Sequence, residues 1–181
     1  MALFKTNPKD PLSASPDFAA PQSDAIPAVP SGGPSAAECM QVGQLLVDSN
    51  QLSADALGSC LQLANGDLLR FADLALNRFS CGRQEVSLAI GQVLGIPAAD
   101  TKGIELNAEI VALLDEQIIR THQVIPITLE GETLVVLAAD PSPYRRADVE
   151  AAAGRPVRWF VGDAATVRTF IDRTHRADAD V

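Results

Sequence analysis

The chain has 181 residues, of which 47% are hydrophobic, and its formal net charge at pH 7 is −9. So acidic a protein lacks the basic face that nucleic-acid-binding proteins use, and it has no electrostatic attraction to an anionic membrane surface. The sequence contains no run of 18 apolar residues and no apolar signal-peptide core at its start. We therefore expect a soluble, cytoplasmic protein that binds no nucleic acid and does not insert into a membrane.

Residues 1–36 are predicted to form a disordered tail. The segment holds seven of the twelve prolines, many Ser and Ala residues, and few large apolar side chains. Ordering it would cost about 1–2 kcal/mol of backbone entropy per residue, with little burial to offset that cost. A solvated leader is the simpler interpretation, and the alternative is a tether or a short docking peptide around Leu3 and Phe4.

Residues 37–97 are predicted to form a duplicated helical subdomain. An offset of 29 residues places 41–64 over 70–93, and the apolar positions of the two segments then coincide. Each copy has the pattern of a short helix, a turn and a second helix. Because one such pair cannot bury its apolar stripe alone, we expect the two copies to pack together. The four helices are expected at about 36–50, 53–64, 68–79 and 83–94.

Residues 98–176 are predicted to form a small α/β subdomain, followed by a tail at 177–181. A helix is expected from the cap Asn107 to about Thr121, and Pro126 inside the first strand indicates an edge strand or a bulge. The remaining elements are strands at 123–129 and 133–138 joined by a hairpin, a helix at 144–153, a strand at 157–161 and a helix at 163–174. The fold class is therefore predicted to be α+β, with the helical subdomain packed on a three- or four-stranded sheet and its flanking helices.

No catalytic constellation is present in the sequence. A phosphate-binding loop, a G-x-S-x-G elbow, an H-E-x-x-H helix and paired cysteines are all missing. The three cysteines are odd in number, and Cys60 has the position of a buried small thiol on an apolar helical stripe. His122 and His175 have no ligand partners at a recognisable spacing. We expect no catalytic residues, no metal site and no resident cofactor, and hence no enzyme.

Several phrases of the sequence carry a family resemblance: VGQLLVDSNQLSADAL, VLGIP, HQVIPITLEGETLVVLAADP and VRWFVGDAATVRTFID. With the order of elements, they resemble the N-terminal domain of type II secretion and type IV pilus assembly ATPases, the GspE/MshE N-terminal family, over about residues 38–176. In that family the domain precedes a large ATPase, and this sequence stops at Val181, where such a motor would begin. The resemblance therefore implies the family's adaptor role, which is docking to partner proteins of an export or pilus machine, without ATPase activity.

In one branch of the family the domain also binds cyclic di-GMP, through two copies of a motif that begins R-L-G and ends in Gln. The frame of that motif fits 41–64 and 70–93, with a five-residue spacer between them. The contents fit less well, because Gln41 stands where the motif has arginine in the first copy, and Phe71 replaces leucine in the second. The residues that the resemblance points to as ligand contacts are Gln41, Val42, Gly43, Leu46, Arg70, Phe71 and Gln92.

A second candidate site is the pair Arg145 and Arg146, at the start of the helix that follows Pro143. Arginines beside a helix N-terminus can contact a phosphate or a carboxylate, which makes the pair a candidate anion contact. The alternative is a solvated face on which they pair with Asp148 or Glu150.

These patterns lead to a ranked prediction. The chain is expected to be a non-enzymatic adaptor that binds a protein partner of a secretion or pilus machine through its helical half. The alternative is a cyclic di-GMP sensor with a degenerate motif, using Gln41, Gly43 and Arg70. A purely structural remnant is the third class.

Overall fold

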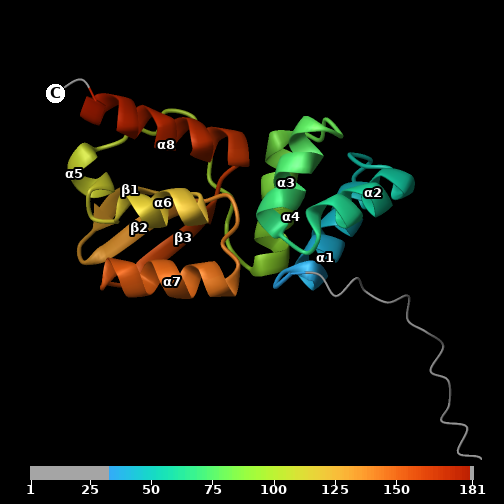
Figure 1. Cartoon of the computed structure of the whole chain (residues 1–181), viewed down its shortest axis with the longest axis horizontal. Helices are drawn as coiled ribbons and strands as arrows, with labels where there is room; N and C mark the ends of the chain where they lie inside the picture. Colours follow the sequence, from blue (N-terminus) through green and yellow to red (C-terminus); the bar gives the residue numbers. More distant parts are fainter. Residues whose placement is uncertain (1–32, 180–181) are drawn as a thin grey trace, which may run out of the picture.

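The computed structural model describes residues 33–179, and the sequence that precedes them lies outside that range. Within this range α1–α4 form one end of the molecule, and the sheet with α5–α8 forms the other (Figure 1). The elements are α1 (Ala36–Asp48), α2 (Ala54–Ala64), α3 (Leu68–Asn77), α4 (Arg83–Leu94), α5 (Ala108–Val111), α6 (Glu116–His122), β1 (Val124–Glu130), β2 (Thr133–Ala138), α7 (Pro143–Ala153), β3 (Val157–Val161) and α8 (Ala164–Ala179). The predicted α+β class is confirmed.

The helical half repeats with the predicted register. The amide of Leu52 donates to the carbonyl of Leu46 at 3.1 Å, and 29 residues later the amide of Cys81 donates to the carbonyl of Ala75 at 2.9 Å. Helices α1 and α4 pack against each other, as do α2 and α3. Exchanging the two copies maps one of these contacts onto the other. The duplication is therefore a pseudo-twofold arrangement whose seam buries the apolar stripes of both copies.

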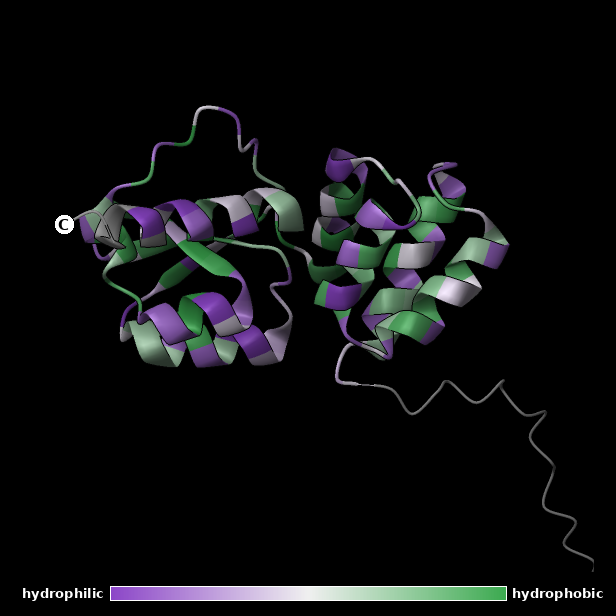
Figure 2. Cartoon of the chain, turned by 45° about the horizontal axis from the view of Figure 1, so that its top comes forward, coloured by the Kyte–Doolittle hydropathy of each residue, from purple (hydrophilic) through white to green (hydrophobic). Residues whose placement is uncertain are grey.

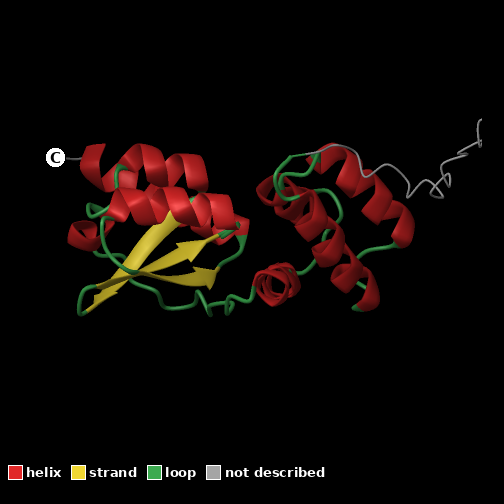
Figure 3. Ribbon diagram, turned by 90° about the horizontal axis from the view of Figure 1, so that it is seen from below, coloured by secondary structure: helices red, strands yellow, loops and turns green. Residues whose placement is uncertain are grey.

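The sheet has the strand order β1–β2–β3, with β1 antiparallel and β3 parallel to the central strand β2. The register of β1 shifts between Pro126 and Thr128, which confirms the predicted irregularity in an edge strand. Gly131 has a φ of +62° in the turn between β1 and β2, a backbone conformation that glycine adopts without strain. In place of a full fourth strand, Ala98 forms a single parallel bridge to Val161 and so ties the end of the helical half to the sheet. Figure 3 shows the strands at one end of the molecule and the helical half at the other.

The structure has two short helices where the sequence predicted one. The helix expected from Asn107 to Thr121 is interrupted, because α5 ends at Val111 and α6 begins only after Asp115. The carboxylate of Asp115 accepts the amide of Gln117 at 2.8 Å, so it caps a new helix instead of continuing the old one. The apolar spacing across 110–119 could not distinguish one continuous helix from two short ones, because both short helices face the same core.

Parts of both predicted tails belong to the fold. Residues 1–32 of the expected tail lie outside the described range, whereas the amides of Gly33 and Ser35 donate to the carbonyls of Asn65 and Gly66 at 2.9 and 3.0 Å. At the other end, α8 runs to Ala179 and so includes 177–179 of the expected 177–181 tail, while residues 180–181 lie outside the described range. Among the described helices none is both long and apolar enough to cross a membrane.

Candidate functional site

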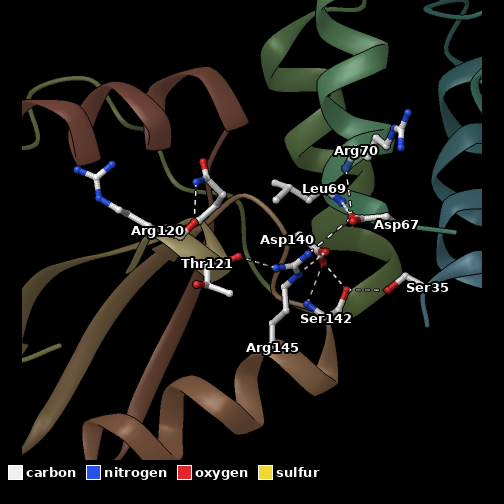
Figure 4. Close-up of polar contacts among 10 residues, drawn as sticks. Ser35, Asp67, Leu69, Arg70, Arg120, Thr121, Asp140, Ser142 and Arg145 are labelled. Atoms are coloured by element: carbon white, nitrogen blue, oxygen red, sulfur yellow. Dashed lines mark hydrogen bonds and ion pairs between the residues drawn. The ribbon is translucent and has the colours of Figure 1, made fainter. Parts of the chain in front are cut away.

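A buried polar cluster lies where the two halves meet (Figure 4). Asp140 follows β2 and is fully buried, and Arg145 in the first turn of α7 is 7% exposed. The Nε of Arg145 lies 3.0 Å from Oδ2 of Asp140, and its Nη1 donates to the carbonyl of Thr121 at 3.2 Å. A buried charge of each sign is thus neutralised by the other and is satisfied by further hydrogen bonds.

The loop before α7 builds this cluster from its local sequence, Asp140-Pro-Ser142-Pro. The amide of Ser142 donates to Oδ1 of Asp140 at 3.0 Å, and its hydroxyl also donates to that oxygen. Pro143 then occupies the first turn of α7, where no amide hydrogen is needed. Burial raises the pKa of Asp140, and the hydrogen bonds from Ser142 and the charge of Arg145 act in the opposite direction.

The same cluster reaches into the helical half. The Nη2 of Arg145 lies 3.7 Å from Oδ1 of Asp67, and the hydroxyls of Ser142 and Ser35 are 3.1 Å apart. Asp67 is also the N-cap of α3, where it accepts the amide of Leu69 at 2.9 Å. We call Ser35, Asp67, Asp140, Ser142 and Arg145 the junction cluster, because these five side chains join the α/β half to the start of α1 and of α3.

The junction cluster bears on the predicted anion contact at Arg145 and Arg146. The anions that Arg145 meets are two carboxylates of its own chain, and neither Asp148 nor Glu150 pairs with it. Asp148 instead lies 3.6 Å from the Nε2 of His122. Arg146 is half-buried, and its Nε has no hydrogen-bond partner among the described residues.

The ligand contacts predicted from the cyclic di-GMP motif divide into two groups. Three of them are exposed at the surface of the helical half: Gln41, Arg70 and Gln92. The side chain of Arg70 points away from the junction cluster in Figure 4, although its amide donates to Asp67. The other four are buried in the helical core: Val42, Gly43, Leu46 and Phe71.

Gly43 illustrates the packing of these four buried residues. A Cβ placed on this residue would lie 2.1 Å from Cδ1 of Leu57 and 3.2 Å from Cζ of Phe71. The glycine therefore makes room for side chains of its own core, where α1 meets the second and third helices. The first glycine of the motif frame has a packing role in this chain.

Surface apolar side chains are concentrated on the helical half. Met40 on α1 is 48% exposed and Leu88 on α4 is 52% exposed, and these two helices pack against each other. Among the described residues only Tyr144 is a further large hydrophobic of this kind. Figure 2 shows the mixture of green and purple over these helices. The apolar pattern of the sequence groups Met40 with Leu45 and Leu46 on one side of the first helix, whereas the structure exposes Met40 and buries Leu46.

The structure confirms that Cys60 is a buried thiol, as its place on an apolar helical stripe predicted. Cys39, Cys60 and Cys81 are all free and buried. Burial raises the pKa of Cys39 and of Cys60 to about 12, so both thiols are protonated at neutral pH. Over residues 33–179 no group of three or more His, Cys, Asp or Glu side chains is arranged to hold a metal ion.

Comparison with known proteins gives matches to one family. Residues 94–180 match the MshEN domain model. The type IV pilus assembly ATPase PilB of Myxococcus xanthus (strain DK1622) is 22% identical over 134 residues, which are 74% of this chain and 24% of PilB. The chain thus spans about a quarter of the length of this curated relative.

Two solved structures share the fold. MshE, solved with cdg, is 19% identical, with coverage of 74% of this chain and 97% of that one and a TM-score of 0.56. The N-terminal domain of XpsE is 21% identical, with coverage of 75% and 94% and a TM-score of 0.59. The family match in residues 94–180 and the fold shared with both structures confirm the predicted resemblance to the N-terminal domain of type II secretion and type IV pilus assembly ATPases.

Proposed function

We propose that this chain is a non-enzymatic, cytoplasmic adaptor module that binds a protein partner of a secretion or pilus machine through its helical half. The observation that carries the proposal is the exposure of Met40 and Leu88 on two adjoining helices of a domain related to those machines. Fully burying a large apolar side chain contributes about 1.5–3 kcal/mol, and since Met40 and Leu88 are about half exposed, a partner that covers them gains about half of that at each residue.

The test is titration calorimetry with the soluble components of the machine, each purified and added singly. Replacing both anchors, in the variant Met40→Asp with Leu88→Asp, is expected to weaken binding of the cognate component by about 100-fold, since two charges must then be buried or displaced. The matched control is Ala147→Asp, which adds a carboxylate to an exposed position of α7. Equal affinity of the wild type and the double variant for every component that binds would contradict the proposal.

A second candidate function, cyclic di-GMP binding, is favoured by one feature of the repeat. Gln41 and Arg70 occupy equivalent positions, 29 residues apart, and both are exposed. They could contact a phosphate of the ligand from the two halves of the pseudo-twofold arrangement. MshE, a structural relative, was solved with cdg.

Calorimetry with cyclic di-GMP separates this second function from the first. Saturable binding with a Kd of about 1 μM that is lost in Arg70→Ala would support it, and heats that stay flat up to about 1 mM would end it. The control is Arg78→Ala, which removes another exposed arginine of the helical half and should leave binding unchanged.

A further inference from the structure

His122, the last residue of α6, is buried beside the junction cluster. It is 7% exposed, and its Nε2 lies 3.6 Å from Oδ2 of Asp148 on α7. Its Nδ1 is also buried, and it has no hydrogen-bond partner among the described residues. The carbonyl of the preceding residue, Thr121, accepts Nη1 of Arg145 at 3.2 Å (Figure 4). The imidazole is therefore adjacent in the chain to the contact by which Arg145 holds α6.

The surroundings of His122 suit a neutral imidazole better than a protonated one. A neutral histidine can direct its single N–H at Asp148 and keep Nδ1 as an acceptor, whereas protonation turns Nδ1 into a second, charged donor. A buried charged donor that lacks an acceptor is costly. Asp148 offers little compensation, because its side chain is 62% exposed and the two atoms are 3.6 Å apart.

The charges that face His122 come from α7 and from the loop before it. Burial lowers the pKa of His122, and the guanidinium of Arg145 lowers it further, whereas the carboxylates of Asp148 and Asp140 act in the opposite direction. A helix C-terminus ordinarily favours a protonated histidine through its free carbonyls. The last carbonyls of α6, however, already accept the backbone and side-chain amides of Gln123 and the guanidinium of Arg145.

The other charges on the elements around His122 are paired elsewhere. The strand β1 also packs against α6, and its one ionisable side chain, Glu130, lies 3.0 Å from Arg158. Within α6 itself, Glu116 and Arg120 lie 2.9 Å apart. The nearest cation to a proton on His122 is thus the buried guanidinium of the junction cluster.

We propose that His122 is a pH-sensitive switch at the contact between the two halves of the molecule. Neutral His122 lets Arg145 bind Thr121 and Asp67 at once, and protonated His122 displaces that guanidinium. Because Nη2 of Arg145 lies 3.7 Å from Asp67, its displacement also loosens the link to the helical half. Protons bind the loosened state more tightly, so the contact is complete above about pH 6.5 and is lost as the pH falls through the lower pKa that His122 has in the joined state.

The experiment is an NMR titration of the full chain between about pH 7.5 and about pH 5. The sequence has two histidines, His122 and His175, so replacing each in turn assigns their ring signals. The His122 ring is expected to titrate with a midpoint below about 6.5. The Nε–H signal of Arg145 and the two backbone amides that donate to Asp67 should shift with the same midpoint.

Three variants separate the switch from general acid effects. His122→Gln supplies a neutral side chain and should abolish the response of Arg145 and of the amides at Asp67, whereas the matched control His175→Gln should leave it unchanged. Asp148→Asn alters an exposed carboxylate, so the fold tolerates it. It should lower the His122 midpoint by roughly half a pH unit and move the response of Arg145 by the same amount.

Two results would overturn the proposal. A response at the Asp67 amides that persists in His122→Gln would mean that a carboxyl group such as that of Asp140 is titrating instead. A His122 midpoint that moves in Asp148→Asn while the response at Arg145 stays in place would show that the two are not coupled, and this comparison decides the matter even where His122→Gln is unfolded.

Discussion

Arg145→Met is the change that best tests how the two halves are joined. It removes a guanidinium whose side chain is 9% exposed and leaves the carboxylate of Asp140, 0% exposed, without its counter-charge. The hydroxyl and amide of Ser142 remain as its hydrogen-bond donors. The methionine fills most of the volume of the arginine, so that the loss is mainly one of charge and hydrogen bonding.

The expected loss of stability follows from the burial of Arg145 and Asp140. Breaking a buried ion pair by removing one partner costs about 3–5 kcal/mol, because the other charge stays behind without compensation. The pair with Asp67 adds little, since its atoms are 3.7 Å apart and Asp67 is 45% exposed. With a urea dependence of about 2 kcal/mol per M, the unfolding midpoint should fall by roughly 2 M.

The assay is urea unfolding of the full chain, followed by circular dichroism. The double variant Asp140→Asn with Arg145→Met removes both charges, and it should recover much of the lost stability because no buried charge is left unpaired. The control is Arg158→Met. Arg158 also lies 3.0 Å from a carboxylate, that of Glu130, but those two side chains are 57% and 55% exposed, so this change should cost no more than about 1 kcal/mol.

Equal midpoints for Arg145→Met and Arg158→Met would refute the reasoning, as they would mean that burial does not amplify the loss of the charge. A double variant no more stable than Arg145→Met would refute it too, because the penalty would then lie in packing and not in the orphaned carboxylate of Asp140.

Three further predictions concern packing, capping and thiol reactivity. Gly43→Ala should destabilise the fold by about 1 kcal/mol in a thermal melt, because the clash with Leu57 outweighs the better helix propensity of alanine; a stabilised variant would contradict this. Asp115→Ala should cost about 1 kcal/mol by removing the cap of α6, and Asp115→Asn, which retains a cap, should cost less. With pKa values of about 12, Cys39 and Cys60 should resist iodoacetamide at about pH 8 until urea unfolds the chain, as mass spectrometry can measure; alkylation of the native protein would show that the thiols are accessible.

Local patterns were sufficient for most of the secondary structure. The helix over 83–94 and the strand over 157–161 have the predicted bounds, because strong start and stop signals such as Gly95 flank their apolar patterns. The 110–119 region was predicted as one helix because a capping carboxylate at Asp115 also fits the exposed face of a continuous helix. Only the packing against the sheet distinguishes these two possibilities.

The candidate site was less predictable, for a reason seen at Arg145. By sequence, this residue is an arginine at a helix start with carboxylates three and five positions later. In the structure it contacts Asp140, five positions earlier, and Asp67, which is 78 positions away along the chain. The contact with Asp67 depends on how the halves dock, and the contact with Asp140 depends on the conformation of the loop before α7. Spacing within one helix carries no information about either contact.

The sequence by itself determined the duplication, the α+β class and the family resemblance, because apolar periodicity and turn residues act over a few neighbouring positions. Only the tertiary structure decided that Gly43 and Phe71 belong to the core, that Met40 and Leu88 lie on the surface, and that Arg145 pairs with carboxylates of its own chain. Burial and the pairing of charges depend on which distant segments come together, and that is a property of the packed molecule.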